Sequence, residues 1–406
     1  EDSNLEDIPT ANMEAYDYYL KGNYFWHTKT TKEGNLQAVA MYEKAIELDP
    51  KFGLAYARQS IVHSVLYQEQ DWDPTPERLA LALKTLEFAK SLIPDHPETH
   101  FAQGIYSKWC LKDNASAISE LELAFQGQPS NGEIANLLGT IYVFAGNWPK
   151  AEIYINKAYE LDPEGLNHAV MVASYAYMLR DYEKAIEYHR LSLQYDAEGA
   201  YLYRQYAMTV RYGYGDLQKS KKIITDGILN SDAPGIFPAD LIMIHLESRD
   251  YVAALKVTQE SYDGDFRSYH KSLCYYFLGD ERLLQGELDS ARTNFKAMIA
   301  QTPGDALIYS RLGLVEAMVG DRERAIEYGK KAMEITPVEV DALDGPVRVF
   351  DLALIYTLVG EDDLALDLLQ ELLAYPSGIT QWRIKLHPGF DSLKGHSRYQ
   401  LMMITV

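Results

Sequence analysis

Cysteine and long apolar runs are both scarce in this chain. The 406 residues include two cysteines, Cys110 and Cys274, and neither belongs to a Cys-x-x-Cys pair. Two cysteines cannot form a disulfide framework, and they leave the compartment open. No run of eighteen apolar residues occurs, so the sequence predicts no membrane span.

Basic residues are also scarce relative to acidic ones. Lys and Arg total 38 against 59 Asp and Glu, which gives a formal net charge of −21. Such a surface repels phosphates, so we expect no nucleic-acid binding by this chain. The charge favours basic partners, although the simpler alternative is that it keeps a large protein soluble. Hydrophobic residues at 47% and charged residues at 24% are typical of folded proteins and exclude disorder and fibres.

A recurring spacing of small residues is the strongest feature that is present. After Gly139, small residues and a proline follow in steps of 12, 7 and 5 residues. Small side chains let two helix backbones approach closely, and a proline ends the second helix because it lacks an N–H. The spacing therefore predicts pairs of antiparallel helices. Three copies match it: Gly139, Ala151, Ala158, Pro163; Gly279, Ala291, Met298, Pro303; and Gly313, Ala325, Ala332, Pro337.

Looser copies fill most of the remaining chain, and the pattern resembles the tetratricopeptide repeat. That family has a Leu-Gly-x-x-Tyr, Ala-x-x-x-Phe and Pro signature with a period of about 34 residues. The resemblance implies an all-α fold, a right-handed superhelical solenoid of about ten helix pairs with a C-terminal cap. We expect an N-terminal flank over 1–14, repeats one to six over 15–232, repeats seven to ten over 233–376 and a capping segment over 377–406. The register is weakest at 230–237, where turn-forming residues gather.

The two ends of the chain resemble the repeat regions of multidomain bacterial signalling proteins. Residues 9–22 resemble the opening of such regions, and 386–400, which begin Leu-His-Pro-Gly-Phe-Asp, resemble their closing segment. In that group the repeats accompany a winged-helix DNA-binding domain, a Ser/Thr kinase or a class III nucleotide cyclase. The chain carries no kinase or cyclase motif, so the resemblance implies the sensory or partner-binding half.

These observations predict a protein- or peptide-binding module, the sensory or regulatory part of a bacterial signalling protein. The alternative is a free-standing scaffold that assembles an envelope or secretion complex. Glu1 is neither Met nor part of an apolar signal core, so we interpret the chain as a processed product or a piece. Whatever precedes Glu1 in the gene separates the two hypotheses. The third hypothesis is an enzyme, but the sequence contains no catalytic or cofactor motif. It also contains no metal-ligand set, because the closely spaced His96 and His100 lack a third ligand. Oligomeric state stays open.

The family resemblance also implies where a partner binds. The first helix of each pair lines a groove, and its positions 2, 5, 9, 12 and 13 face inward. The 31 tyrosines favour recognition, since tyrosine offers rigid contact area with one polar group, although many could instead fill space between helices. We expect a basic or aromatic-rich peptide here; the convex face and the loop Gln68–Glu77 are the alternatives. The candidate ligand-binding residues are Tyr16, Tyr19, Asn23, Trp26, Phe101, Lys108, Trp109, Asn136, Phe144, Tyr177, Tyr201, Arg204, Arg211, Tyr212 and Tyr276.

The last prediction from sequence concerns the end of the solenoid. An open array of helix pairs leaves an apolar face at its end, which terminal elements must cover. Five apolar side chains after the last repeat are spaced to do this: Trp382, Ile384, Leu386, Phe390 and Leu393.

Overall fold

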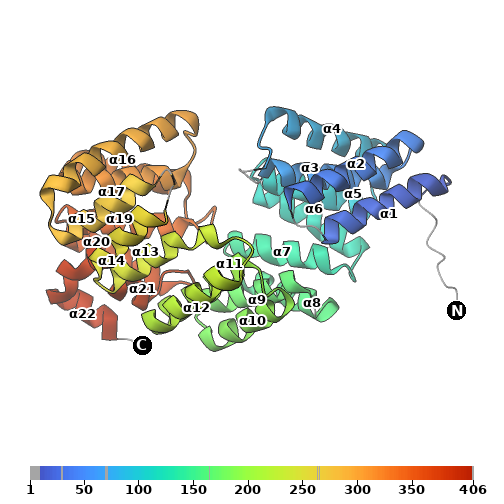
Figure 1. Ribbon diagram of the computed structural model, residues 1–406. Coiled ribbons are helices and arrows are strands. Elements are labelled where there is room, and N and C mark those ends of the chain that lie inside the picture. The colour runs from blue at the N-terminus through green and yellow to red at the C-terminus, as the bar shows by residue number, and fades with distance from the viewer. Residues whose placement is uncertain are drawn as a thin grey trace. The chain divides into compact units, whose positions relative to one another are not determined.

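The fold is entirely helical over the residues that the structure describes. A computed structural model describes residues 10–28, 31–68, 72–163, 165–262, 264 and 266–404. Over these residues the chain forms 22 α-helices, two 3-10 helices and no strand (Figure 1). None of the helices in these ranges combines the length and apolar character needed to cross a bilayer. The prediction of an all-α solenoid of about ten helix pairs is confirmed.

The helices divide into two compact units. The N-terminal unit runs to Tyr142 and continues over Asn147–Asp162, and the C-terminal unit comprises Val143–Gly146 and the chain from Pro163 onward. The weak register at 230–237 does not separate the units. There η1 (Pro234–Ile236) leads into the next helix, and Phe237 is fully buried in one apolar cluster with Ile224 and Ile244.

Four helix pairs make up the N-terminal unit. Close approach within a pair depends on the small residues of the repeat: a Cβ added to Gly104 would lie 2.6 Å from Cγ of Leu121. The same holds at Gly139, where an added Cβ would lie 2.7 Å from Cγ1 of Ile155. The helices are α1 (Met13–Thr28), α2 (Lys32–Leu48), α3 (Gly53–Gln68), α4 (Pro76–Leu92), α5 (Pro97–Trp109), α6 (Asn114–Gly127), α7 (Gly132–Phe144) and α8 (Trp148–Leu161).

Six helix pairs and three terminal elements make up the C-terminal unit. The pairs are α9 (Leu166–Met178) and α10 (Tyr182–Tyr195), α11 (Ala200–Tyr214) and α12 (Leu217–Asn230), α13 (Pro238–Glu247) and α14 (Tyr251–Glu260), α15 (Arg267–Leu278) and α16 (Glu281–Gln301), α17 (Ala306–Val319) and α18 (Arg322–Ile335), and α19 (Gly345–Leu358) and α20 (Asp362–Ala374). The terminal elements are α21 (Gln381–Leu386), η2 (Pro388–Gly395) and α22 (Ser397–Ile404).

In six of the helix pairs the turn between the two helices follows one local rule. A residue in the left-handed backbone region precedes an aspartate whose side chain accepts a hydrogen bond from the next helix's first turn, as at Gly215 and Asp216. Glycine suits the left-handed position because it has no Cβ. Arginine occupies it twice, at Arg180 with φ 63° and Arg249 with φ 60°. Both arginines donate to backbone carbonyls later in the chain, Arg180 to those of Leu373 and Tyr375 and Arg249 to that of Leu386.

The residues after α20 fold back over first helices of their own unit. We call residues 377–404 the closing segment. The Tyr177 hydroxyl of α9 donates to the carbonyl oxygen of Gly378 at 3.0 Å, and the Thr380 hydroxyl donates to the carbonyl oxygen of Tyr212, in α11, at 2.5 Å. Farther along, Nη2 of Arg249 lies 2.5 Å from Oδ1 of Asp391. The segment therefore covers α9, α11 and the end of α13.

The closing segment also covers α19, as a cap would. Ile384, Phe390 and Leu393 are fully buried, and the Phe390 ring packs edge-on against Phe350 of α19 with centroids 5.3 Å apart. Leu386 is partly buried. Trp382 differs from the expectation, since 40% of it is exposed and its ring lies over Gly215 at the end of α11.

Candidate functional site

In the N-terminal unit, charged side chains from three first helices meet at Arg58. Arg58 of α3 is 8% exposed. Its Nε lies 2.6 Å from Oε1 of Glu98, in α5, and its Nη1 lies 3.2 Å from Oε2 of Glu133, in α7. The guanidinium also lies 5.7 Å from the ring centre of Phe101. Helix α3 packs against α5, and the long Arg58 side chain also reaches Glu133, so one arginine pairs with carboxylates from the next two helix pairs.

Helix α1 adds aromatic and amide groups to the same place. The Trp26 indole donates to Oε1 of Glu133 at 2.9 Å. The Asn23 amide oxygen accepts a 2.7 Å hydrogen bond from the hydroxyl of Tyr42. Tyr19 packs against Phe52 with ring centroids 5.1 Å apart. We refer to Tyr19, Asn23, Trp26, Arg58, Glu98, Phe101 and Glu133 together as the Arg58 cluster.

The Arg58 cluster carries one negative charge in excess when both carboxylates are ionised. Burial raises the pKa of Glu98, and the Arg58 guanidinium offsets only part of that rise. Burial also acts to raise the pKa of Glu133, but Arg58 and the Trp26 indole outweigh it and hold that pKa below its usual value. Glu133 is therefore ionised at neutral pH. Its side chain is 29% exposed, so the excess charge can meet a cation from outside.

The other predicted residues of this unit lie beside the Arg58 cluster or point elsewhere. The Tyr16 ring stacks on Tyr19 at 6.2 Å. Lys108 donates to Oδ1 of Asn114 at 2.9 Å and lies 5.1 Å from the Trp109 ring centre, so it links α5 to α6. Asn136 has a buried Oδ1 for which the described residues provide no hydrogen-bond donor.

In the C-terminal unit, three predicted groove residues are buried and their partners belong to the chain itself. Tyr177 donates to the closing segment at Gly378. The Tyr212 hydroxyl donates to Oε1 of Glu247 at 2.9 Å, and burial raises the pKa of Tyr212 to about 12. Nε of Arg211 lies 3.5 Å from Oε2 of Glu247. The chain's own contacts therefore occupy this part of the surface.

The remaining predicted residues are scattered over the C-terminal unit. Tyr201 is 53% exposed. Nε of Arg204 donates to Oδ2 of Asp240 at 2.8 Å, and Tyr276 packs edge-on against Phe277, with ring centroids 5.3 Å apart. The carbonyl oxygen of Phe144 accepts from the Ala342 N–H at 2.8 Å. These contacts do not bring the four residues together.

Sequence reasoning missed the three charged members of the Arg58 cluster. Glu98 and Glu133 are each the second residue of a first helix, a position that the inward-facing pattern includes. The pattern could therefore have found both. Arg58 is harder to place, because the long loop between α3 and α4 interrupts the repeat spacing from which its register would be read.

His96 and His100, which lie four residues apart in the sequence, have separate partners in the structure. His96 caps α5 by accepting from the Glu98 N–H at 3.0 Å, and Nδ1 of His100 lies 2.7 Å from Oε2 of Glu120. Across the described ranges, no group of three or more His, Cys, Asp or Glu side chains could hold a metal ion.

Comparison with known proteins finds repeat proteins. A family model described as "Tetratricopeptide repeat" matches residues 276–339. Tetratricopeptide repeat protein 37 of Xenopus laevis is 22% identical over 207 residues, which cover 44% of this chain and 13% of that protein. The chain thus spans about an eighth of its curated relative.

Solved structures of similar fold come from bacteria and from humans. A tetratricopeptide repeat protein from Parabacteroides merdae is 15% identical, with 65% of this chain and 99% of that chain covered and a TM-score of 0.44. PilF of Pseudomonas aeruginosa is 15% identical, with 56% and 97% covered and a TM-score of 0.43. The human IFIT1 dimer with m7Gppp-AAAA is 15% identical, with 96% and 86% covered and a TM-score of 0.48.

Proposed function

Because this chain is a tetratricopeptide repeat protein, we propose that it binds a protein or peptide through the first-helix surface of its N-terminal unit. It acts by binding and not by catalysis. The observation that carries the proposal is the Arg58 cluster, where four successive first helices contribute side chains to one polar centre. Aromatic side chains beside it offer apolar contact, since Trp26 and Tyr16 are both partly exposed.

The charges of the Arg58 cluster favour a basic group on the partner. One guanidinium faces two carboxylates, and the outer carboxylate, Glu133, is accessible. A Lys or Arg side chain of a peptide would compensate the excess charge there. The net charge of −21 would add attraction during the encounter, so raising salt should slow association more than it speeds dissociation.

The test starts from peptides selected on the full chain from a random library. Binding of the selected peptides is then measured by fluorescence anisotropy for the parent chain and for Glu133→Gln. This change keeps an acceptor for Trp26 and removes the charge, so we expect about tenfold weaker binding of Lys- or Arg-containing peptides. Glu47→Gln on α2, where the Glu47 side chain is 57% exposed, is the matched control and should change nothing.

Melting curves of both variants establish that they are folded. If well-folded Glu133→Gln binds every selected peptide as the parent chain does, the partner site is not the Arg58 cluster. The convex face and the loop between α3 and α4 would then be examined next.

We further propose that this binding module is the sensory or regulatory part of a bacterial signalling protein. The support is the resemblance of residues 9–22 and 386–400 to the flanks of such repeat regions. Sequencing the gene upstream of the codon for Glu1 tests this proposal. A winged-helix, kinase or cyclase domain there would support it, whereas a signal peptide would contradict it and favour a scaffold for an envelope or secretion complex.

A further inference from the structure

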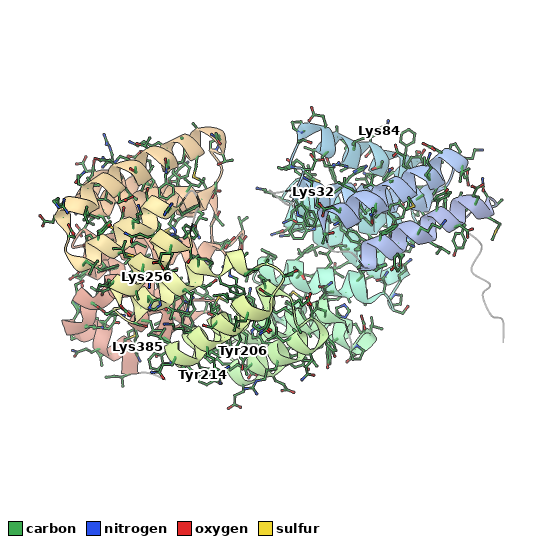
Figure 2. The ribbon with its side chains drawn as sticks, in the orientation of Figure 1. Lys32, Lys84, Tyr206, Tyr214, Lys256 and Lys385 are labelled. Atoms are coloured by element: carbon green, nitrogen blue, oxygen red, sulfur yellow. The ribbon has the colours of Figure 1, made fainter. Side chains whose placement is uncertain are left out.

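The C-terminal unit contains a pocket of about 880 Å³ between helix ends and the closing segment. Drug-sized ligands occupy pockets of roughly 300–1,000 Å³. Its walls come from the turn after α9, the ends of α11 and α20, and from α21 and α22. Figure 2 labels two of the lining residues, Tyr214 at the end of α11 and Lys385 in α21. None of the described residues that line the pocket is Asp or Glu.

Contacts within the chain hold the walls of this pocket in place. Nη2 of Arg180 donates to the carbonyl oxygens of Leu373 at 3.0 Å and Tyr375 at 3.3 Å, which ties the turn after α9 to the end of α20. Gly215 has φ 72°, and a Cβ there would lie 2.4 Å from Cε3 of Trp382. The Trp382 ring can therefore approach the end of α11 only because residue 215 is glycine. The pocket is formed before any ligand arrives.

The cations that line the pocket differ in how they are compensated. Arg398 pairs with Asp363 and Asp367 of α20, at 3.3 and 2.5 Å. Arg180 donates hydrogen bonds to backbone carbonyls, and these compensate part of its charge through the end of α20. Lys385 lies 5.0 Å from the Trp382 ring centre and forms no ion pair with any residue in the described ranges. An uncompensated ammonium in an acid-free pocket is unusual for a chain of net charge −21.

Aromatic and apolar surface adjoins that ammonium. Tyr214 is 45% exposed and Trp382 is 40% exposed. Leu373 and Met402 add apolar surface to the same lining. A ligand ring placed against this surface would remove apolar area from water, which is favourable at about 25 cal/mol per Å².

We propose that this pocket binds a small aromatic monocarboxylate. Its carboxylate would lie at Lys385 and Arg180, and its ring would lie against Tyr214 and Trp382. The Lys385 ammonium, which has no carboxylate partner among the described residues, matches the single negative charge of a carboxylate, and the Arg180 guanidinium supplies further donors beside it. The site is separate from the Arg58 cluster, so it stands or falls independently of the proposed peptide-binding function.

Isothermal titration calorimetry with three related probes tests the proposal on the full chain. Indole-3-acetate is the anion, indole-3-acetamide is its neutral counterpart and tryptamine is the cation. We expect the anion to bind about tenfold more tightly than the amide, and the cation to bind most weakly. No heat from the anion at millimolar concentration, or equal affinity for the anion and the amide, would overturn the proposal.

Two variants assign the binding to this pocket. Lys385→Gln should remove the preference for the anion over the amide, and its matched control, Lys256→Gln on α14, should keep it (Figure 2). Trp382→Ala should weaken the anion and the amide alike, since both share the ring. Melting curves show whether each variant is folded. A folded Lys385→Gln that still prefers the anion would mean that the carboxylate binds elsewhere, and the proposal would be wrong.

Discussion

Replacing Phe390 with alanine should destabilise the C-terminal unit and leave the N-terminal unit unchanged. Phe390 belongs to η2 of the closing segment and is fully buried. Its ring packs edge-on against Phe350 at 5.3 Å and is tilted against His387 at 5.6 Å. Truncation at this position would remove those ring contacts and leave a cavity between η2 and α19.

The expected cost follows from the burial of the side chain. Truncating a buried Phe to Ala typically costs about 3–5 kcal/mol, including the cavity that is left. Whole domains are stable by about 5–15 kcal/mol, so the change should remove a large fraction of the stability of the C-terminal unit. Leu229→Ala on α12 is the matched control, because Leu229 is 77% exposed and its truncation should cost less than about 0.5 kcal/mol.

Urea denaturation gives the size of the effect, and amide hydrogen exchange read by mass spectrometry gives its place. In Phe390→Ala, peptides from α11 and α19 should exchange faster, because both helices contact the closing segment. Peptides from α3 and α5 should keep their protection. The reasoning is refuted if Phe390→Ala and Leu229→Ala lose equal stability, or if protection falls equally in α3 and α5.

Two further substitutions, at His189 and Arg58, test how buried ionisable side chains affect the stability of the fold. His189 is 3% exposed, and its Nε2 lies 2.9 Å from Oγ1 of Thr209. Burial lowers the pKa of His189 to about 4, so the folded chain holds this imidazole neutral where the unfolded chain protonates it. The stability that this group contributes above pH 6.5 is therefore lost as the pH falls from 6.5 toward 4. Urea denaturation of His189→Gln should therefore show about 2 kcal/mol less loss between pH 7 and 5 than the parent chain; an equal loss would contradict this. Arg58→Met leaves Glu98 buried without its cation and should cost about 3–5 kcal/mol at pH 7. Adding Glu98→Gln should restore part of the lost stability. A double variant that is no more stable than Arg58→Met alone would refute the pairing of Arg58 with Glu98.

The helix pairs could be predicted from sequence because their determinants are local. Gly139 and Ala151 allow close packing within one pair, and their spacing can be read along the chain. The path of the closing segment could not be predicted from sequence, because the hydrogen bond from Tyr177 to Gly378 joins residues 201 positions apart. No spacing rule connects such residues. The ion pair between Arg249 and Asp391 could not be predicted either. Arg249 occupies a left-handed turn position where glycine is expected, so the repeat pattern assigns its side chain no contact.

The candidate site was predictable to the extent that repeat position determines which way a side chain points. Tyr19, Trp26 and Phe101 were selected by position, and the structure brings them together around Arg58. Position does not say what lies opposite a side chain. Tyr212 occupies a groove position too, but its hydroxyl meets Glu247 and its backbone carbonyl meets Thr380 of the closing segment.

The two first-helix surfaces differ in the sign of the charge that they accept, and this difference supports separate roles for the units. In the C-terminal unit, Arg249 pairs with Asp391, so a carboxylate on the closing segment meets a cation on the surface. That pairing is satisfied within the chain and leaves no need for a partner. In the N-terminal unit, Arg58 is outnumbered by Glu98 and Glu133, and no other cation from the described residues forms an ion pair with either carboxylate. Of these two pairings, the one at Arg58 therefore leaves a negative charge unsatisfied, and a basic partner gains most by binding there.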